Sequence, residues 1–151
     1  CINAALEHFY GPGDDTTKFV SYILRNLIQG AEKIDLTKGE QKRDFVFIDD
    51  VVEAFMIILK NVGNFNNKFY NFEIGSNKSR SIKEIVEMMK DILNNKKTVL
   101  NFGALPYREN EVMECVADIS EITKLGWSGK YSLEEGLKKT IDFELKSANN
   151  I

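Results

Sequence analysis

The apolar residues of the chain form two kinds of segment, which alternate along the sequence. Short runs with strand-forming composition lie at 2–10, 33–36, 44–48, 69–74 and 98–102. Longer stretches with apolar residues three and four positions apart, typical of amphipathic helices, lie at 19–28, 51–59, 82–93 and 133–145. Because strands and helices alternate with short connections, the pattern predicts the α/β class.

Polar residues in front of three helical segments predict where those helices begin. Ser81 with Glu84, and Ser132 with Glu135, have the Ser-x-x-Glu spacing of a capping box. The pair Asp49-Asp50 is expected to cap the helix at 51–59. These signals fix the starts of three helices.

Three segments are too apolar for a half-exposed position. The strand 44–48 is apolar on both faces, and the helix 51–59 is apolar almost all round, so it is expected to be covered on every side. The sequence opens at Cys1, already inside the strand 2–10. We therefore expect a piece of a longer protein, in which these segments are poorly covered by this chain alone.

Composition narrows the function classes. A chain of 151 residues and 17.2 kDa is expected to form one domain. Its net charge of −3 argues against a nucleic-acid partner, and its apolar runs are too short for a membrane span. With one histidine and two distant cysteines, no metal site or disulfide framework is expected, and a reducing, cytoplasmic compartment is the default.

Searches for common catalytic motifs find no phosphate-binding glycine loop between a strand and a helix, no metal-ligand spacing and no nucleophile elbow. Three polar clusters remain beside apolar segments, at 7–12, 41–44 and 106–111. From the residue types alone, each has an ordinary explanation. His8 fits a structural histidine, Arg43 a surface charge and Arg108 a solvated loop.

Taken together, these clusters resemble the signatures of one family. The runs 8–13 (HFYGPG), 43–52 (RDFVFIDDVV), 70–76 (YNFEIGS) and 107–112 (YRENEV) are similar to successive motifs of the extended short-chain dehydrogenases, the NAD-dependent epimerase/dehydratase family. The closing runs 117–120, 125–127 and 132–137 resemble the usual end of these chains. The resemblance covers nearly the whole sequence, with its motifs in the family's order.

The resemblance implies a fold and a position within the enzyme. Residues 1–151 would be the C-terminal, substrate-binding portion of a longer enzyme: the end of the Rossmann sheet plus a small α/β domain. Residues 1–10 and about 44–75 would pack on the N-terminal Rossmann sheet. The family's glycine-rich loop and Tyr-x-x-x-Lys pair do not occur, since Glu111 and Glu135 stand four positions after Tyr107 and Tyr131. No catalytic residue, no turnover and no dinucleotide affinity are therefore expected of this chain alone.

The resemblance also implies which residues meet the substrate, a nucleoside diphosphate sugar. Arg43 and Arg108 would contact the diphosphate and its ribose, since guanidinium groups make bidentate bonds to phosphate. Glu111 would accept hydrogen bonds from ribose hydroxyls. Asn110 replaces the glycine that is usual in this loop, a departure softened because Asn tolerates a positive φ. If so, Arg43, Arg108 and Glu111 should converge on one cleft.

His8 and Tyr10 complete the implied site. His8 stands where many members have Asn, next to the sugar and the nicotinamide, and either donates a hydrogen bond to the sugar carbonyl or only positions the sugar. Tyr10 would contact the cofactor, NAD or NADP, which the N-terminal part would mainly bind. His8 and the stretch 32–45 resemble the branch of CDP-abequose synthase-like reductases, which act on 4-keto-6-deoxyhexoses.

Three functions stay open at this point. The chain is expected to be the substrate-binding part of an NAD(P)-dependent reductase of nucleotide-linked 4-keto-6-deoxy sugars, in an enzyme that is a homodimer. A 4-epimerase or 4,6-dehydratase of the same family is the alternative within the fold. A non-catalytic binding domain that kept the arginines is the alternative from another class.

Overall fold

The computed structural model describes residues 1–66 and 69–148, and it has the mixed α/β architecture that the sequence predicts. The strands are β1 (Ile2–Leu6), β2 (His8–Tyr10), β3 (Lys33–Leu36), β4 (Lys42–Phe47), β5 (Tyr70–Ile74), β6 (Ser79–Ser81) and β7 (Val99–Phe102). The helices are α1 (Phe19–Ile28), α2 (Ile48–Lys60), α3 (Ile82–Ile92), α4 (Ser120–Lys124) and α5 (Leu133–Ala148), with a 3₁₀ turn η1 (Val62–Asn64).

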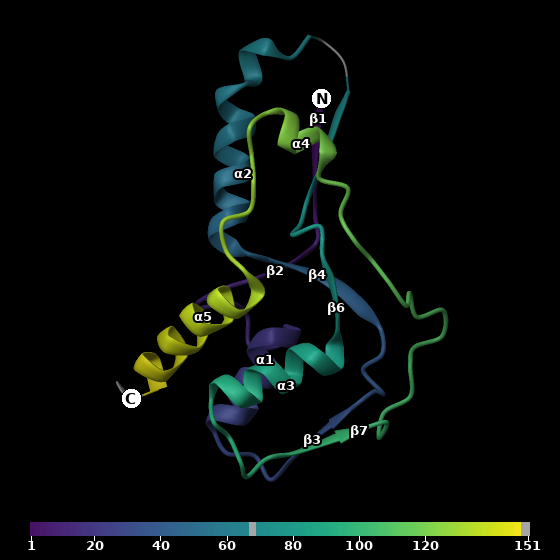
Figure 1. The fold of residues 1–151 in the computed structure, drawn as a ribbon, viewed down its shortest axis with the longest axis vertical. Coiled ribbons are helices and arrows are strands. Elements are labelled where there is room, and N and C mark those ends of the chain that lie inside the picture. Colours follow the sequence, from purple (N-terminus) through teal and green to yellow (C-terminus); the bar gives the residue numbers. More distant parts are fainter. Residues whose placement is uncertain (67–68, 149–151) are drawn as a thin grey trace.

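The strands form three small sheets (Figure 1). β1 pairs in parallel with β5, and β3 pairs in parallel with β7. β4 lies between β2, its parallel neighbour, and β6, its antiparallel neighbour. The segment 2–10, expected as one strand, is divided at Glu7, so that one stretch of chain serves two sheets.

β4 lies between two hydrophobic cores because its side chains alternate in direction. Phe45 and Phe47 belong to a core shared with α1, α3 and α5. Val46 belongs to a second core shared with α2, β5 and α4, where Trp127 is almost fully buried. Figure 1 shows α1 and α3 on the same side of β4, where they contact each other and both contribute to the first core.

A buried carboxylate on β4 joins these regions. Asp44 is fully buried and accepts hydrogen bonds from the amide and hydroxyl of Ser76, at 2.7 and 2.5 Å, and from the amides of Asn77 and Ala117, at 3.0 and 3.2 Å. The turn after β5 and the segment before α4 are thereby fixed to β4. Gly75 is required at this turn, since a Cβ there would lie 2.6 Å from Asp44 Oδ2.

The helix starts agree with the sequence in two cases of three. Both capping boxes are confirmed, at Ser81 with Glu84 and at Ser132 with Glu135. The cap predicted at Asp49-Asp50 was wrong, because β4 runs directly into α2 and places both residues in the first helical turn. Asp50 is instead buried and accepts hydrogen bonds from the amides of Lys130 and Tyr131, at 2.9 and 3.1 Å.

The chain covers its apolar segments unequally. For the strand 44–48 the expectation of poor cover was wrong, because the chain's own residues bury β4 from Asp44 to Phe47. On α2, by contrast, exposed apolar side chains form a stripe with helical spacing: Val52, Phe55, Met56 and Leu59. Within the described residues, α2 is therefore not covered on every side, and β1 has a strand on one edge alone. None of the helices described here has the length and apolarity needed to span a membrane.

Candidate functional site

Most of the residues singled out in the sequence line one cleft. His8, Arg43, Arg108 and Glu111 border a cavity of about 470 Å³, here called the clamp cleft, although they come from three separate parts of the sequence. The convergence of Arg43, Arg108 and Glu111 is the geometry that the resemblance implied.

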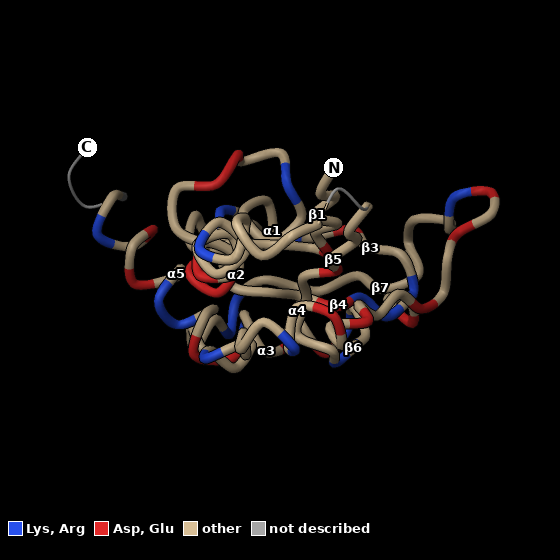
Figure 2. Tube along the Cα trace, turned by 90° about the horizontal axis from the view of Figure 1, so that it is seen from above, with Lys and Arg blue, Asp and Glu red and all other residues tan. Residues whose placement is uncertain are grey.

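A pair of strands positions two of these side chains, and a long loop positions the other two. Arg43 and His8 stand on the paired strands β4 and β2, where His8 is the register partner of Phe45. Arg108 and Glu111 stand in the loop between β7 and α4, which projects from the body of the molecule (Figures 1 and 2). Asn110 in this loop has a φ of 62°, the left-handed conformation expected where the family usually has glycine.

The projecting loop is tied to the body at both ends. Near its start, the Tyr107 hydroxyl accepts a hydrogen bond from the Glu40 amide at 3.1 Å. Near its end, the Lys42 amide donates to the Met113 carbonyl at 2.7 Å, and the Cys115 amide donates to the Lys42 carbonyl. These contacts bring Arg108 and Glu111 beside the first residues of β4.

Arg43 and Glu111 form an ion pair across the clamp cleft. Arg43 Nη2 lies 2.5 Å from Glu111 Oε1, and the two side chains are only 12% and 18% exposed. Arg43 Nη1 also donates to the Lys42 carbonyl, which fixes the guanidinium plane. Because the pair is largely desolvated, its attraction is stronger than that of a surface ion pair. Glu111 therefore orients Arg43.

Arg108 presents an available charge to the same cleft. Its side chain is exposed, and in the described parts of the chain no hydrogen bond or ion pair engages its guanidinium. A guanidinium has five N–H donors in a planar fork that matches phosphate or carboxylate oxygens. The cleft therefore combines one arginine held by a carboxylate with one arginine open to an anionic ligand.

His8 borders the cleft beside a supporting carboxylate that the sequence analysis overlooked. The imidazole Nδ1 lies 3.6 Å from Glu7 Oε2, and the ring lies 5.5 Å from that of Phe45. The Cys115 thiol donates to both oxygens of Glu7 at 3.4 Å. Burial, together with this carboxylate, raises the pKa of the Cys115 thiol, so it stays a protonated donor. Glu7 could have been found from the sequence, because it lies in the polar cluster at 7–12. Cys115 could not, because it is 108 positions away along the chain.

Apolar and polar side chains from α1, β3 and the loop before Tyr107 complete the wall of the cleft. The apolar members include Phe19, Ile23, Leu36, Leu105 and Pro106. Asp35, Thr37 and Gln41 supply polar groups at the rim. A cavity with an apolar wall and cationic residues fits a ligand that has both a ring system and an anionic group. The sequence pattern placed Phe19, Ile23 and Leu36 in predicted helix and strand segments, because burial and wall formation select the same residue types, whereas Leu105 and Pro106 lie outside every predicted helix and strand.

Tyr10, the residue expected at the cofactor, is placed in the first core. It is almost fully buried, its hydroxyl donates to the Leu133 carbonyl at 3.0 Å, and its ring lies 5.7 Å from that of Phe47. Burial raises the pKa of this phenol well above its usual value, with a smaller contribution from the charge of Asp50. Its cofactor contact stays a prediction. Among the residues described, no three metal-ligating side chains come together.

Comparison with known proteins gives three concordant results. A model of the NAD dependent epimerase/dehydratase family matches residues 1–75. CDP-abequose synthase of Salmonella muenchen is 41% identical over 143 residues, which are 95% of this chain and 47% of that protein. The structure of UDP-glucose 4-epimerase from Thermotoga maritima with UDP-glucose has a TM-score of 0.82 and 27% identity, covering 97% of this chain and 46% of that one.

A second solved structure agrees with the first. MoeE5 in complex with UDP-glucuronic acid and NAD has a TM-score of 0.82 and 26% identity, covering 97% of this chain and 47% of that one. The chain thus spans about half the length of the relatives it matches.

Proposed function

The chain belongs to the NAD dependent epimerase/dehydratase family, and we propose that it is the nucleotide-sugar-binding part of an NAD(P)-dependent reductase of nucleotide-linked 4-keto-6-deoxy sugars. Residues 1–151 would be the C-terminal portion of that enzyme. The segments 1–10 and about 44–75 would pack on an N-terminal Rossmann sheet. The coverage of about half of each relative, the single paired edge of β1 and the exposed stripe of α2 support this division.

The arrangement of charge in the clamp cleft carries the proposal. A nucleoside diphosphate has two phosphate charges, which suit the open fork of Arg108 and the oriented fork of Arg43. Glu111 keeps one oxygen for the ribose hydroxyls while the other holds Arg43. The apolar wall offers a surface for the base or the sugar ring. Binding and orienting the substrate are thus the tasks of this chain's own residues.

The reductase assignment rests on the identity with CDP-abequose synthase and on His8. Glu7 lies beside Nδ1, and the protonated imidazole, which carries an N–H on both nitrogens, would donate from Nε2 toward a sugar carbonyl. The alternative role, in which His8 only positions the sugar, needs the same orientation. Hydride transfer itself would require groups from outside this chain.

The cofactor would be NAD or NADP, as the family's name indicates. In the described residues, the chain offers no glycine-rich loop, and the Tyr10 hydroxyl is engaged in the core. These residues do not by themselves fit a dinucleotide, so we derive no step through it and assign no catalytic residue here. The proposed whole enzyme is cytoplasmic and homodimeric, without a nucleic-acid or membrane partner.

Assay of the protein that carries this sequence tests the proposal. With a CDP-linked 4-keto-6-deoxyhexose, a reductase oxidises one NAD(P)H for each sugar reduced. Interconversion of UDP-hexoses without net consumption of NAD(P)H would instead indicate a 4-epimerase. The similarity to the solved UDP-glucose 4-epimerase supports this alternative. Loss of water from a nucleotide-linked hexose would indicate the 4,6-dehydratase. Nucleotide binding without any turnover would indicate the non-catalytic binding domain.

A further inference from the structure

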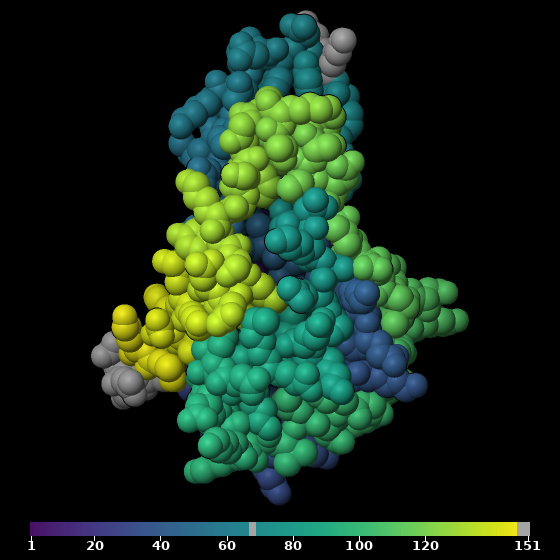
Figure 3. Space-filling model, viewed as in Figure 1, coloured from purple at the N-terminus to yellow at the C-terminus, as the bar shows by residue number. Residues whose placement is uncertain are grey.

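A second cavity, of about 580 Å³, lies beside β4 and is distinct from the clamp cleft. Of the residues described, Phe45 is the one that both cavities have in common. Figure 3 shows the opening as a hollow between the yellow-green segment that runs into α5 and the teal turn after β5. Its lining includes the buried residues Phe45 and Val46 of β4 and the exposed residues Lys78, Arg80, Thr123 and Ser128.

The walls of the second cavity are held in place by groups in the protein interior. The Asp44 carboxylate fixes the turn that carries Ser76 on one side. The Asp50 carboxylate fixes the loop amides of Lys130 and Tyr131 on the other side. The cavity is therefore preformed, and a ligand would not have to order these loops.

The acidic groups and one basic group of the second cavity already have partners, whereas its other two basic residues, Lys78 and Arg80, extend into solvent. Asp50 accepts two backbone amides, and Glu135 accepts from Ser132, whose hydrogen bonds lower the pKa of that carboxyl. Lys130 is paired with Glu53 at 2.7 Å. By contrast, within the described residues the exposed side chains of Lys78 and Arg80 make no hydrogen bond or ion pair, although, after the hydrogen bonds from Ser81, the charge of Arg80 helps to lower the pKa of the nearby Glu84 carboxyl.

The lining of the second cavity also has an apolar component. The partly exposed Ile119, Tyr131 and Leu133 line the same cavity as the two basic side chains, with the buried Phe45 and Val46 behind them. The hydroxyls of Thr123 and Ser128 add neutral donors to the lining. A ligand that satisfies both parts has an apolar or aromatic ring and an anionic group of phosphate type.

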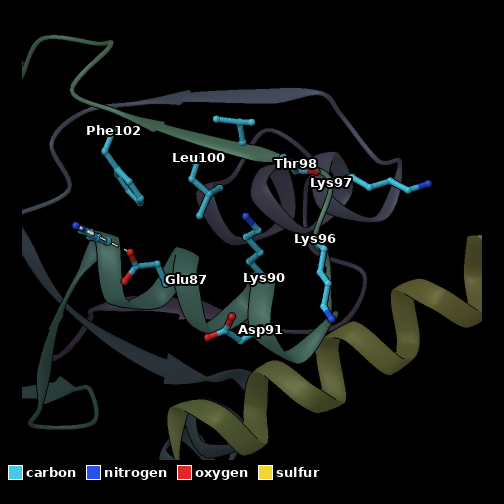
Figure 4. A pocket seen from close by; sticks show the side chains of 10 residues that line it. Glu87, Lys90, Asp91, Lys96, Lys97, Thr98, Leu100 and Phe102 are labelled. Atoms are coloured by element: carbon cyan, nitrogen blue, oxygen red, sulfur yellow. Dashed lines mark ion pairs between the residues drawn. The ribbon is translucent and has the colours of Figure 1, made fainter.

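A lysine-rich groove between α3 and β7 serves as the contrast (Figure 4). It has a similar volume, about 590 Å³, and is lined by four lysines. There, Lys83 lies 4.0 Å from Glu87, Asp91 adds a second carboxylate, and the Lys97 side chain is directed away from the groove. The groove thus has an acidic partner for Lys83 and a second carboxylate, Asp91, in its lining.

We propose that the second cavity binds a small aromatic organic phosphate, held by Lys78 and Arg80 with its ring against the apolar lining. This ligand site is additional to the clamp cleft and does not depend on the proposed reductase function. It would take its ligand whichever sugar the enzyme processes.

The test uses phenyl phosphate as the probe, titrated into the protein that carries this sequence by calorimetry and by saturation-transfer NMR. All titrations are made in an Arg108→Ala background, so that the open arginine of the clamp cleft does not contribute. Phenyl phosphate is expected to bind more tightly than phenol or inorganic phosphate, because each of these has only half of the recognised features. Lys78→Ala/Arg80→Ala should then weaken binding by at least roughly 10-fold.

Two further variants make the result specific. Lys96→Ala/Lys97→Ala also removes two positive charges, but from the groove of Figure 4, and should leave phenyl phosphate binding unchanged. Ser128→Asp adds a negative charge to the lining of the same cavity and should weaken binding without removing a basic residue. Equal affinity in the parent and the Lys78→Ala/Arg80→Ala variant, or no binding to the parent, would overturn the proposal.

Discussion

The part of the molecule around α1, α3 and α5 and the part around α2 and β1 differ in how far the chain covers them (Figure 1). In the first part, apolar side chains from strands and helices enclose one another, and Ile23, Ile85 and Leu137 are fully buried. In the second part, α2 is buried on one side, while Leu59 on the other is 63% exposed. The first part also carries most of the clamp cleft. The chain thus closes its proposed substrate-binding part and leaves an apolar face where an N-terminal Rossmann sheet is proposed to pack.

The largest effect on stability is expected from loss of the Asp44 carboxylate, whose hydrogen bonds join the two parts. Asp44→Ala leaves four hydrogen-bond donors without their acceptor in a buried turn and should lower the free energy of unfolding by on the order of 3 to 5 kcal/mol. Urea denaturation measures this loss. Asp142→Ala, which removes an exposed carboxylate, is the control and should change stability by less than about 0.5 kcal/mol.

Neighbouring residues of α2 separate its covered side from its exposed side. Ile58→Ala removes a side chain that is 4% exposed and should cost about 2 to 4 kcal/mol. Leu59→Ala, one position later, should cost less than about 0.5 kcal/mol in the 151-residue chain. In a longer protein that covers α2, the cost of Leu59→Ala should rise toward that of Ile58→Ala. A cost that stays small there would contradict the proposed packing of 44–75 on a further sheet.

Substitution of one glycine in each of the two parts compares how tightly they are packed. Gly136→Ala would place a Cβ 2.3 Å from the Tyr10 hydroxyl and 2.9 Å from Phe47, and should cost about 1 to 3 kcal/mol in thermal unfolding. Gly63, after α2, has open space around it. Gly63→Ala should therefore be neutral or stabilising by up to about 1 kcal/mol. Equal effects would show that the first part is not more tightly packed than the second.

The smallest expected effect concerns acid stability. Hydrogen bonds from Ser81 and Ser132 lower the pKa values of Glu84 and Glu135 from their usual value of 4.5. A carboxyl with a lowered folded-state pKa stabilises the fold above its unfolded-state pKa, and loses that contribution as the pH falls through the folded-state value. Ser81→Ala/Ser132→Ala should therefore flatten the loss of stability below about pH 4.5. An unchanged acid profile in melting experiments would contradict this assignment.

Local signals allowed part of the fold to be predicted from sequence, and long-range contacts account for the rest. The capping boxes were predictable because Ser81 and Glu84 act within one helical turn. β6 was not, since the polar residues of Ser79–Ser81 form a strand only through pairing with β4. The division of the first strand at Glu7 also depends on partners far along the chain.

In the clamp cleft, too, the contacts that the sequence did not reveal are long-range ones. Residue types alone left Arg43 and Arg108 as ordinary surface residues, and only the family resemblance singled them out. The ion pair of Arg43 with Glu111 joins residues 68 positions apart, so no local pattern could indicate it. It forms because the loop after β7 returns to the start of β4, a consequence of the tertiary fold.

Binding of a nucleoside diphosphate in the clamp cleft is the central proposed property of this chain. Calorimetric titration of CDP, UDP and TDP into the protein that carries this sequence tests it most directly. Arg108→Ala should weaken binding by roughly 10- to 150-fold, and Arg108→Lys should recover little, because a point charge cannot make the bidentate contact. Arg25→Ala, an exposed arginine on α1, should leave the affinity unchanged. Unchanged affinity in Arg108→Ala would contradict the account and leave the loop as ordinary surface.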